Sequence, residues 1–242
     1  LTAADLGTGG ADAAFKTVLF DRATGEPAVP NGSLGFRYNA EDEGKWNLDL
    51  GDIDPVLTLL GREGATGEAV RLPAFDDPSG AGSVLRRGVP VLEVGGRKVT
   101  TVFDLMLAQY GVGREGLPGE WAQGYDDAGT AYTPAWQEEI TSVPAEACIR
   151  IAREFAHNSE VSGGRSMIIM GAGICQWFHG DATYRAILSL LILTGAMGRN
   201  GGGWAHYVGQ EKCRPITGWV SLANALDWSR PPRTMIGTGY WY

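Results

Sequence analysis

The later part of the chain carries the clearer pattern of hydrophobic and polar positions. Residues 100–111, TTVFDLMLAQYG, combine a threonine start, apolar residues at helical spacing and Gly111 where a helix would end. Residues 133–140, TPAWQEEI, predict a second short helix. Residues 142–156 predict a third helix, which would begin with Ser142 as its N-cap. We therefore expect helices to dominate this part of the chain.

Beyond these helices the pattern changes period. Residues 165–173, RSMIIMGAG, read as a short apolar strand that enters a glycine turn, and residues 181–195 predict a helix. A glycine-rich segment follows at residues 198–215. Strand, glycine turn, helix and glycine-rich loop together predict an α/β layout of the nucleotide-binding kind. The apolar run at residues 186–198 is too short to span a bilayer and predicts a buried helix.

The first part of the chain is rich in glycine and weakly periodic. Phe15–Phe20 and Val89–Val94 predict strands, because each is a short apolar run beside turn residues. The stretches NGSLGFRYN and GKWNLDL, at residues 31–39 and 44–50, predict irregular or short-strand structure. This region therefore predicts mixed strands and loops.

Composition and charge narrow the function. The 242 residues include 20 Lys and Arg against 28 Asp and Glu, a formal net charge of −8, which gives nucleic-acid binding no electrostatic support. The three cysteines form no CxxC pair, which argues against a disulfide framework or a cysteine metal site. The sequence also has no GxSxG, P-loop or HExxH motif. Redox or transfer chemistry would therefore need a bound cofactor.

The glycine turn is the first candidate for ligand binding. A GxG turn after a strand can aim backbone N–H groups at a phosphate, and Gly171 and Gly173 have this spacing. The same glycines could instead only tighten the turn. Trp177 and His179 follow in the same turn, although a lone histidine is more often a packed or capping residue than a functional one.

The glycine-rich loop is the stronger candidate. Three consecutive glycines allow unusual backbone angles or a close approach to another group. Several hydrogen-bonding or aromatic side chains follow them closely, and Lys and Arg could make charge-assisted bonds to phosphate. The candidates are Gly201, Gly202, Gly203, Trp204, His206, Gln210, Lys212 and Arg214. The alternative is a solvated loop in which Glu211 simply pairs with Lys212.

Longer motifs add a resemblance to a known family. The segments GRSMIIMGAG, LTGAMGRNGGGWAHYVGQEKCRPITGW and ALDWSRPPR resemble the catalytic alpha subunits of respiratory nitrate reductases, within the dimethyl sulfoxide reductase family of molybdopterin oxidoreductases. The likeness extends through PNGSLGFRY and YTPAWQEEITSVP and so covers essentially the whole chain. It implies an internal piece of a larger, multidomain protein whose α/β, Rossmann-like portion lies here. Residues 1–98 would then be a glycine-rich, mixed strand-and-loop segment, and residues 99–242 an α/β cofactor-binding segment.

The resemblance implies a cofactor and a reaction. The family binds molybdenum in two molybdopterin guanine dinucleotides (bis-MGD), and the candidates named above, from Gly171 to Arg214, would contact it. Nitrate would be reduced to nitrite with electrons relayed from quinol through iron–sulfur clusters. The molybdenum ligand and the ligands of a 4Fe-4S cluster would lie upstream of this chain, so no metal-ligating or catalytic residue is assigned within it.

The resemblance also implies partners and leaves alternatives open. An iron–sulfur beta subunit and a membrane-bound, quinol-oxidising gamma subunit would place the protein on the cytoplasmic face of the cell membrane, without inserting directly into the membrane. Related enzymes act on nitrite, chlorate, perchlorate or selenate, and a non-catalytic scaffold could keep the fold. The chain departs from the family at Cys175 and Gln176, where Asn-His is usual, which bears on its efficiency with nitrate.

Overall fold

A computed structural model describes residues 1–8, 10–31, 49–74 and 84–206. The chain divides into two compact units, Leu1–Ile149 and Arg150–Tyr242, and each is described below by itself. The division predicted from the sequence, into a strand-and-loop segment of residues 1–98 and a cofactor-binding segment of residues 99–242, stays a prediction.

The first unit opens with small elements. Two short 3-10 helices, Ala3–Leu6 and Gly10–Phe15, precede the antiparallel strands β1 (Leu19–Phe20) and β2 (Pro27–Ala28). The strand predicted at Phe15–Phe20 is confirmed only in its last two residues, because Phe15 ends the second 3-10 helix.

Asp21 closes the turn between β1 and β2. Its carboxylate accepts hydrogen bonds from the Thr24 hydroxyl at 2.9 Å and from the backbone N–H of Asp54 at 3.0 Å. These bonds, led by the one from Asp54, hold the pKa of the Asp21 carboxyl below its usual value, because they favour the charged form. Asp21 therefore ties the turn to a segment more than thirty residues away.

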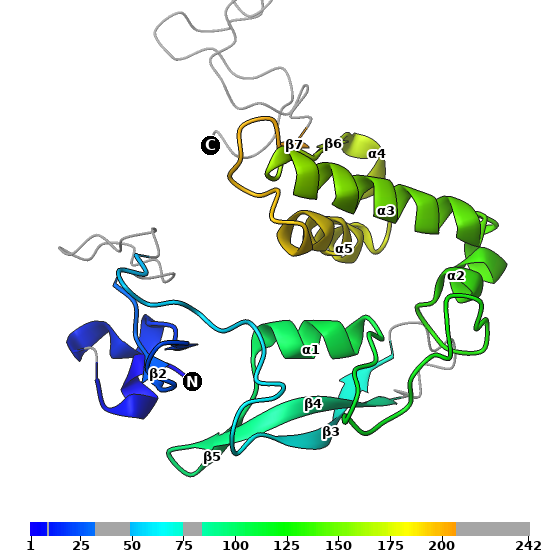
Figure 1. Cartoon of the computed structure of the whole chain (residues 1–242). Coiled ribbons are helices and arrows are strands. Elements are labelled where there is room, and N and C mark those ends of the chain that lie inside the picture. The colour runs from blue at the N-terminus through cyan, green and yellow to red at the C-terminus, as the bar shows by residue number, and fades with distance from the viewer. Residues whose placement is uncertain (9, 32–48, 75–83, 207–242) are drawn as a thin grey trace, which may run out of the picture. The chain divides into compact units, whose positions relative to one another are not determined.

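A three-stranded antiparallel sheet forms the main core of this unit. Its strands β3 (Thr66–Pro73), β4 (Val84–Val94) and β5 (Arg97–Val99) lie in sequence order, and the strand predicted at Val89–Val94 is confirmed as the end of β4. Helix α1 (Val102–Gln109) packs on β4, as Figure 1 shows. The buried residues at their contact are Val89, Val91 and Ala108.

Two helices in this unit begin with a threonine cap, as their sequences indicate. The Thr101 hydroxyl accepts the N–H of Asp104 at the start of α1, and Gly111, with φ of +80°, follows its last turn. Helix α2 (Pro134–Thr141) begins in the same way at Thr133, whose hydroxyl accepts the N–H of Trp136. Both predicted helices are confirmed.

The predicted N-cap at Ser142 is wrong. Ser142 has a left-handed φ of +60° and ends α2, where its N–H donates to the Glu138 carbonyl. Helix α3 runs over Ala145–Ser162, and the N–H of Ala145 donates to the Glu138 carboxylate at 2.8 Å. A carboxylate of the preceding helix therefore satisfies an N-terminal amide that a serine was expected to serve.

A buried arginine fixes the end of α1. Arg87 on β4 is 1% exposed, and its Nη1 donates to the carbonyls of Ala108 and Gln109, each at 3.0 Å. Its guanidinium also lies 5.9 Å from the ring centre of Trp121 and 5.6 Å from that of Tyr132. Burial lowers the pKa of this group. The cation thus pairs with the negative end of the helix and with aromatic faces.

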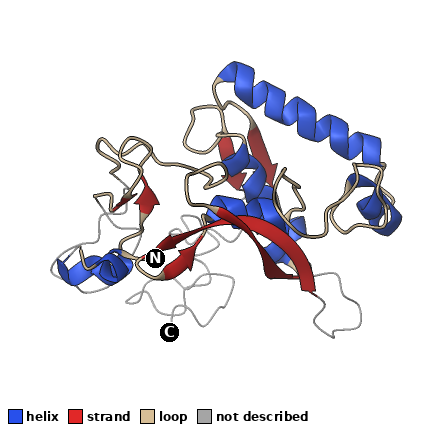
Figure 2. Ribbon diagram, turned by 60° about the horizontal axis from the view of Figure 1, so that its bottom comes forward, coloured by secondary structure: helices blue, strands red, loops and turns tan. Residues whose placement is uncertain are grey.

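The second unit has a different architecture. After most of α3 come β6 (Met167–Met170), α4 (Ala172–Cys175), α5 (Gly180–Leu193) and β7 (Gly203–His206). Strands β6 and β7 pair in parallel and lie side by side in Figure 2. Met167 lies opposite Gly203 and Met170 opposite His206, and the helices α4 and α5 come between the two strands in the sequence. A helical crossover is the usual link between parallel strands. The chain thus has the mixed helix and sheet content expected, and a Rossmann-like arrangement specifically stays a prediction.

The apolar helix α5 buries only one side within the described residues. Leu191 is fully buried, while Leu190, Ile192 and Leu193 are 44%, 59% and 44% exposed. The prediction of a buried helix therefore holds for one stripe of this segment. No helix in the described part of the chain is both long and apolar enough to cross a membrane.

Candidate functional site

The carboxyl ends of β6 and β7 meet at one edge of the parallel pair. Met170 and His206 are the last residues of their strands and lie opposite each other, and Gly171 follows directly. Ligands of α/β proteins bind at the carboxyl ends of parallel strands. The structure therefore brings two sequence-predicted candidates, Gly171 and His206, to the edge where a ligand is expected.

The glycine turn is open on its outer side. A Cβ atom added to Gly171 or to Gly173 would meet nothing within 4 Å in the described structure. Gly171 has an extended φ of −107°, so its backbone is open to any residue. Because neither crowding nor a left-handed backbone calls for glycine here, packing within the described residues does not explain the two glycines.

Three aromatic side chains lie at the same edge. The Tyr184 hydroxyl on α5 donates to the Gly171 carbonyl at 3.4 Å and lies 3.2 Å from Nε2 of His206. The Trp204 ring lies 5.3 Å from that of Tyr184 and stacks at 6.2 Å from that of His206. We call Tyr184, Trp204 and His206 the aromatic cluster. It joins α5, β7 and the turn after β6.

Tyr184 was missed at the level of sequence. It lies twenty-two residues from His206, and the parallel pairing of β6 with β7 brings the two together. One signal could have indicated it: a tyrosine near the start of the helix that follows a glycine turn after a strand.

Two further candidates lie in the turn before α5. Trp177 is 75% exposed, and His179 is exposed, with its ring 4.7 Å from that of Phe178. His179 occupies the N-cap position of α5, but its side chain makes no capping hydrogen bond. Both side chains are therefore available to a ligand. In the described part of the chain neither makes a ring contact with the aromatic cluster.

The three consecutive glycines have a reason within the protein itself. Gly201 and Gly203 have left-handed φ values of +84° and +86°. A Cβ atom on Gly202 would collide with the Gly164 carbonyl oxygen and lie 2.7 Å from that of Ala196. The backbone of this loop packs so closely that only glycine fits at position 202. Contact of these glycines with a cofactor stays a prediction.

Several sequence-predicted residues lie outside this geometry. Gln210, Lys212 and Arg214 fall outside the described residues. Gln176 is the exposed C-cap residue of α4. Its backbone N–H lies near the carbonyl of Ile174. Within the described residues no three His, Cys, Asp or Glu side chains gather as a metal site would require.

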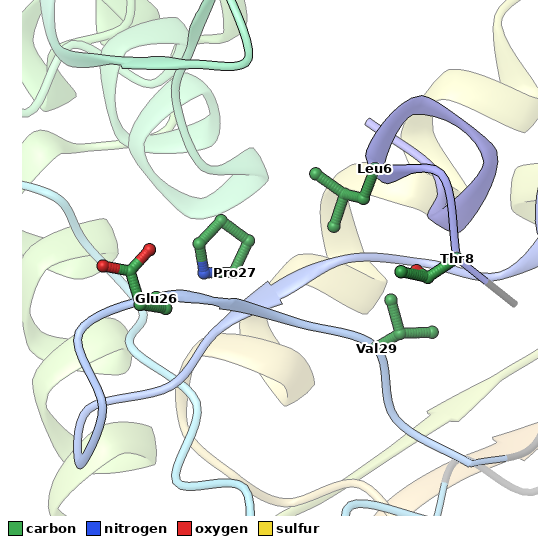
Figure 3. Close-up of a pocket in the computed structure, with 5 residues that line it drawn as sticks. All are labelled: Leu6, Thr8, Glu26, Pro27 and Val29. Atoms are coloured by element: carbon green, nitrogen blue, oxygen red, sulfur yellow. The ribbon is translucent and has the colours of Figure 1, made fainter.

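A separate hollow lies in the first unit. Leu6, Thr8, Glu26, Pro27 and Val29 line it, as Figure 3 shows. Its lining is mostly apolar, and it includes none of the residues that the sequence indicated as candidates. The edge of the β6–β7 pair therefore remains the candidate site.

Comparison with known proteins identifies the family of this chain. A family model described as Molybdopterin oxidoreductase matches residues 39–238. The match spans most of the chain, and the chain belongs to the molybdopterin oxidoreductase family.

Individual relatives are more specific. The chain is 59% identical to the nitrate reductase alpha subunit of Mycobacterium tuberculosis (strain ATCC 25618 / H37Rv) and 45% identical to the nitrate reductase alpha chain of Bacillus subtilis (strain 168), in both cases over 100% of this chain and 20% of the relative. It is 46% identical to the respiratory nitrate reductase 1 alpha chain of Escherichia coli (strain K12), over 94% of this chain and 19% of that protein. The chain thus spans about a fifth of the length of these relatives.

Proposed function

We propose that this chain is part of the catalytic subunit of a molybdenum-dependent nitrate reductase, and that the edge formed by β6 and β7 contributes one wall of its bis-MGD pocket. Family membership and the 59% identity to a nitrate reductase alpha subunit support the reaction. The observation that carries the location is the meeting of an open glycine turn and the aromatic cluster at the carboxyl ends of two parallel strands.

The residues at this edge fit the chemistry of such a cofactor. A molybdopterin guanine dinucleotide offers two kinds of group, a pyrophosphate and flat nitrogen heterocycles. Backbone N–H groups of the turn at Gly171 and Gly173 can approach a phosphate closely, because a Cβ atom at either position would meet nothing within 4 Å among the described residues. Rings such as Trp204 can pack against a heterocycle, and an imidazole can hydrogen-bond to its edge.

The other candidates complete the proposed wall. Trp177 and His179 lie in the turn beside the open glycines and would flank the cofactor. Three residues that come after the aromatic cluster in the sequence would donate hydrogen bonds to the cofactor: Gln210, Lys212 and Arg214. The last two are cationic and would make charge-assisted bonds to its phosphates. Since the net charge of the chain is −8, an anionic cofactor needs such local donors.

The reaction of the whole protein follows from this assignment. Nitrate, two electrons and two protons give nitrite and water. Molybdenum, when bound, supplies the redox chemistry that accepts the oxygen atom. A 4Fe-4S cluster, an iron–sulfur beta subunit and a membrane-bound gamma subunit would deliver electrons from quinol at the cytoplasmic face of the membrane. The residues of this chain would bind and orient the cofactor.

A substrate panel with the full-length protein tests the reaction. We expect the protein, purified with its cofactor, to reduce nitrate with a reduced dye as electron donor and to do so faster than it reduces chlorate, perchlorate or selenate. Trp204→Ala should lower the molybdenum content, while Tyr125→Phe, an exposed site in the first unit, should not. Selective reduction of another oxyanion, or oxidation of nitrite alone, would overturn the proposed substrate. Activity absent from protein with full molybdenum content would favour a scaffold.

A further inference from the structure

We propose that one face of the β6–β7 pair docks an amphipathic helix from a part of the full-length protein that this chain does not include. This face carries Met167 and Ile169 of β6 and Ala205 of β7, and we call it the outer face. The inference goes beyond the proposed function, because it depends neither on nitrate nor on the cofactor.

The pairing of the two strands assigns each residue to a face. Successive side chains of a strand point to opposite faces, and residues opposite each other in the pair share a face. Ile168 lies opposite Trp204, and Met170 lies opposite His206. The rings of Trp204 and His206 lie 5.3 and 5.8 Å from that of Tyr184 on α5, so α5 lies on this face. The outer face is therefore the one that points away from α5.

The outer face leaves large apolar side chains exposed. Ile169 is 76% exposed and Met167 is 48% exposed, whereas Met170 on the α5 face is 3% exposed. The sequence of β6 is nevertheless apolar at every position, Met-Ile-Ile-Met. Strands of parallel sheets have such continuous apolar runs when both of their faces are buried, whereas a strand with one face in water alternates apolar and polar residues. The sequence of β6 therefore indicates that the outer face is covered in the whole protein.

The size of the outer face suits one helix. Two paired strands of 4 residues each, at about 3.3 Å per residue and about 4.8 Å between strands, span roughly 13 by 10 Å. A helix with its side chains is about 10–12 Å wide, and about nine of its residues match the longer dimension. Ile169 stands beside the smaller Ala205, which leaves a step into which helix side chains can pack. Helices are also the elements that cover the faces of parallel sheets.

We assign this helix to the same polypeptide. The chain spans about a fifth of the length of its relatives, so most of such a protein lies outside it. A second copy or another subunit that rested on this face alone would bury far less than the roughly 800 Å² per partner of a typical stable interface. A helix joined through the polypeptide avoids the entropy cost of association.

The reactivity of a thiol at position 169 tests whether the outer face is covered. In the full-length protein, purified with its cofactor and partner subunits, Ile169→Cys would be treated with N-ethylmaleimide, and its peptide quantified by mass spectrometry. We expect this thiol to react at least about tenfold more slowly in native than in unfolded protein, because a buried group reacts only after local opening. Met170→Cys, which is buried on the α5 face, gives the rate of a covered position. A native rate close to that of the unfolded protein would overturn the inference.

Photo-crosslinking of the same full-length protein identifies the occupant. A diazirine amino acid in place of Met167 should link to one segment of the same polypeptide outside residues 1–242, with apolar residues at helical spacing. Mass spectrometry identifies the linked peptide, and the size of the product on a denaturing gel distinguishes a link within one polypeptide from a link to a second. The same amino acid in place of Ile168 is the matched control, because it points to the α5 face and should link within residues 1–242.

Three results of the crosslinking would contradict the inference. They are a link from position 167 to residues 1–242, a link to a second copy or another subunit, and no link from position 167 although position 168 reacts. None of them bears on the reduction of nitrate, which the substrate panel tests separately.

Discussion

The α-carbon of Gly202 faces the carbonyl oxygen of Gly164 so closely that any side chain at position 202 would collide with it. Gly164 is itself confined, since a Cβ atom there would lie 2.7 Å from the Gly195 carbonyl oxygen. Three glycines from separate turns therefore interlock through their backbones. The loop that leads into β7, and thus the position of the aromatic cluster, depends on this contact.

Substitution of Gly202 should disrupt this packing before it affects any ligand. We expect Gly202→Ala in the full-length protein to expose residues 195–206 to hydrogen exchange and to lower cofactor content as a consequence, because the added methyl group meets fixed backbone. Hydrogen exchange measured by mass spectrometry checks the first effect, and molybdenum per mole of protein checks the second. Cofactor loss with unchanged exchange in the loop would show instead that Gly202 contacts the cofactor directly.

Gly173 should behave in the opposite way. It lies within α4, and a Cβ atom there meets nothing within 4 Å, so alanine should cost no packing energy and should favour the helix by about 0.5–1 kcal/mol. If a phosphate approaches this backbone, Gly173→Ala should nevertheless lower the guanine nucleotide content. The measurement is nucleotide released per mole of protein. Full nucleotide content in this variant would argue against a cofactor at the turn.

Gly202 and Gly173 show which structural features can be predicted from the sequence and which cannot. The strand at Met167–Met170 and helix α5 follow directly from local patterns, as do the threonines that begin α1 and α2. The reason for Gly202 does not, because a glycine forced by neighbouring backbone and a glycine kept for a ligand look the same in sequence. Only the structure separates Gly202 from Gly173.

The misplaced elements have the same origin in long-range contacts. Ser142 has the residue type of an N-cap, but Glu138 from the preceding helix takes that role. Tyr184 entered no local motif, because its partner His206 lies on a strand beyond the end of its own helix. The pairing of β6 with β7 is a tertiary event, and so the aromatic cluster could not be read from spacing alone.

The departure at Gln176 should be tolerated by the fold. Its side chain is exposed at the end of α4, so restoring the residues common in the family, Cys175→Asn with Gln176→His, should leave molybdenum content unchanged. If the position lies near the reacting centre, kcat for nitrate should rise. Steady-state kinetics of the full-length variant, normalised to molybdenum, provides the test. A collapse in molybdenum content would mean that this turn is built differently from that of the relatives.

Acid should loosen the first unit at the turn closed by Asp21. The lowered pKa of this carboxyl in the folded state means that its stabilisation is fully present above the unfolded-state value of about 3.9 and is lost as pH falls through the lower, folded value. We therefore expect exchange of the amides in residues 20–28, corrected for intrinsic rates, to increase below about pH 4.

Asp21→Asn provides the control for that prediction. The amide cannot titrate, so the turn should be less protected at neutral pH and its protection should change less between pH 5 and 3. A pH profile unchanged by the substitution would show that another group controls the acid response of this segment.

Hydrogen exchange of the full-length protein, compared with and without cofactor, tests the central claim most directly. The account predicts that cofactor protects the amides of residues 171–184 and 203–206, where the open turn and the aromatic cluster meet, while residues 66–73 of the antiparallel sheet in the first unit change little. Protection elsewhere in the protein, with residues 171–184 and 203–206 unchanged, would contradict the claim that this edge forms a wall of the cofactor pocket.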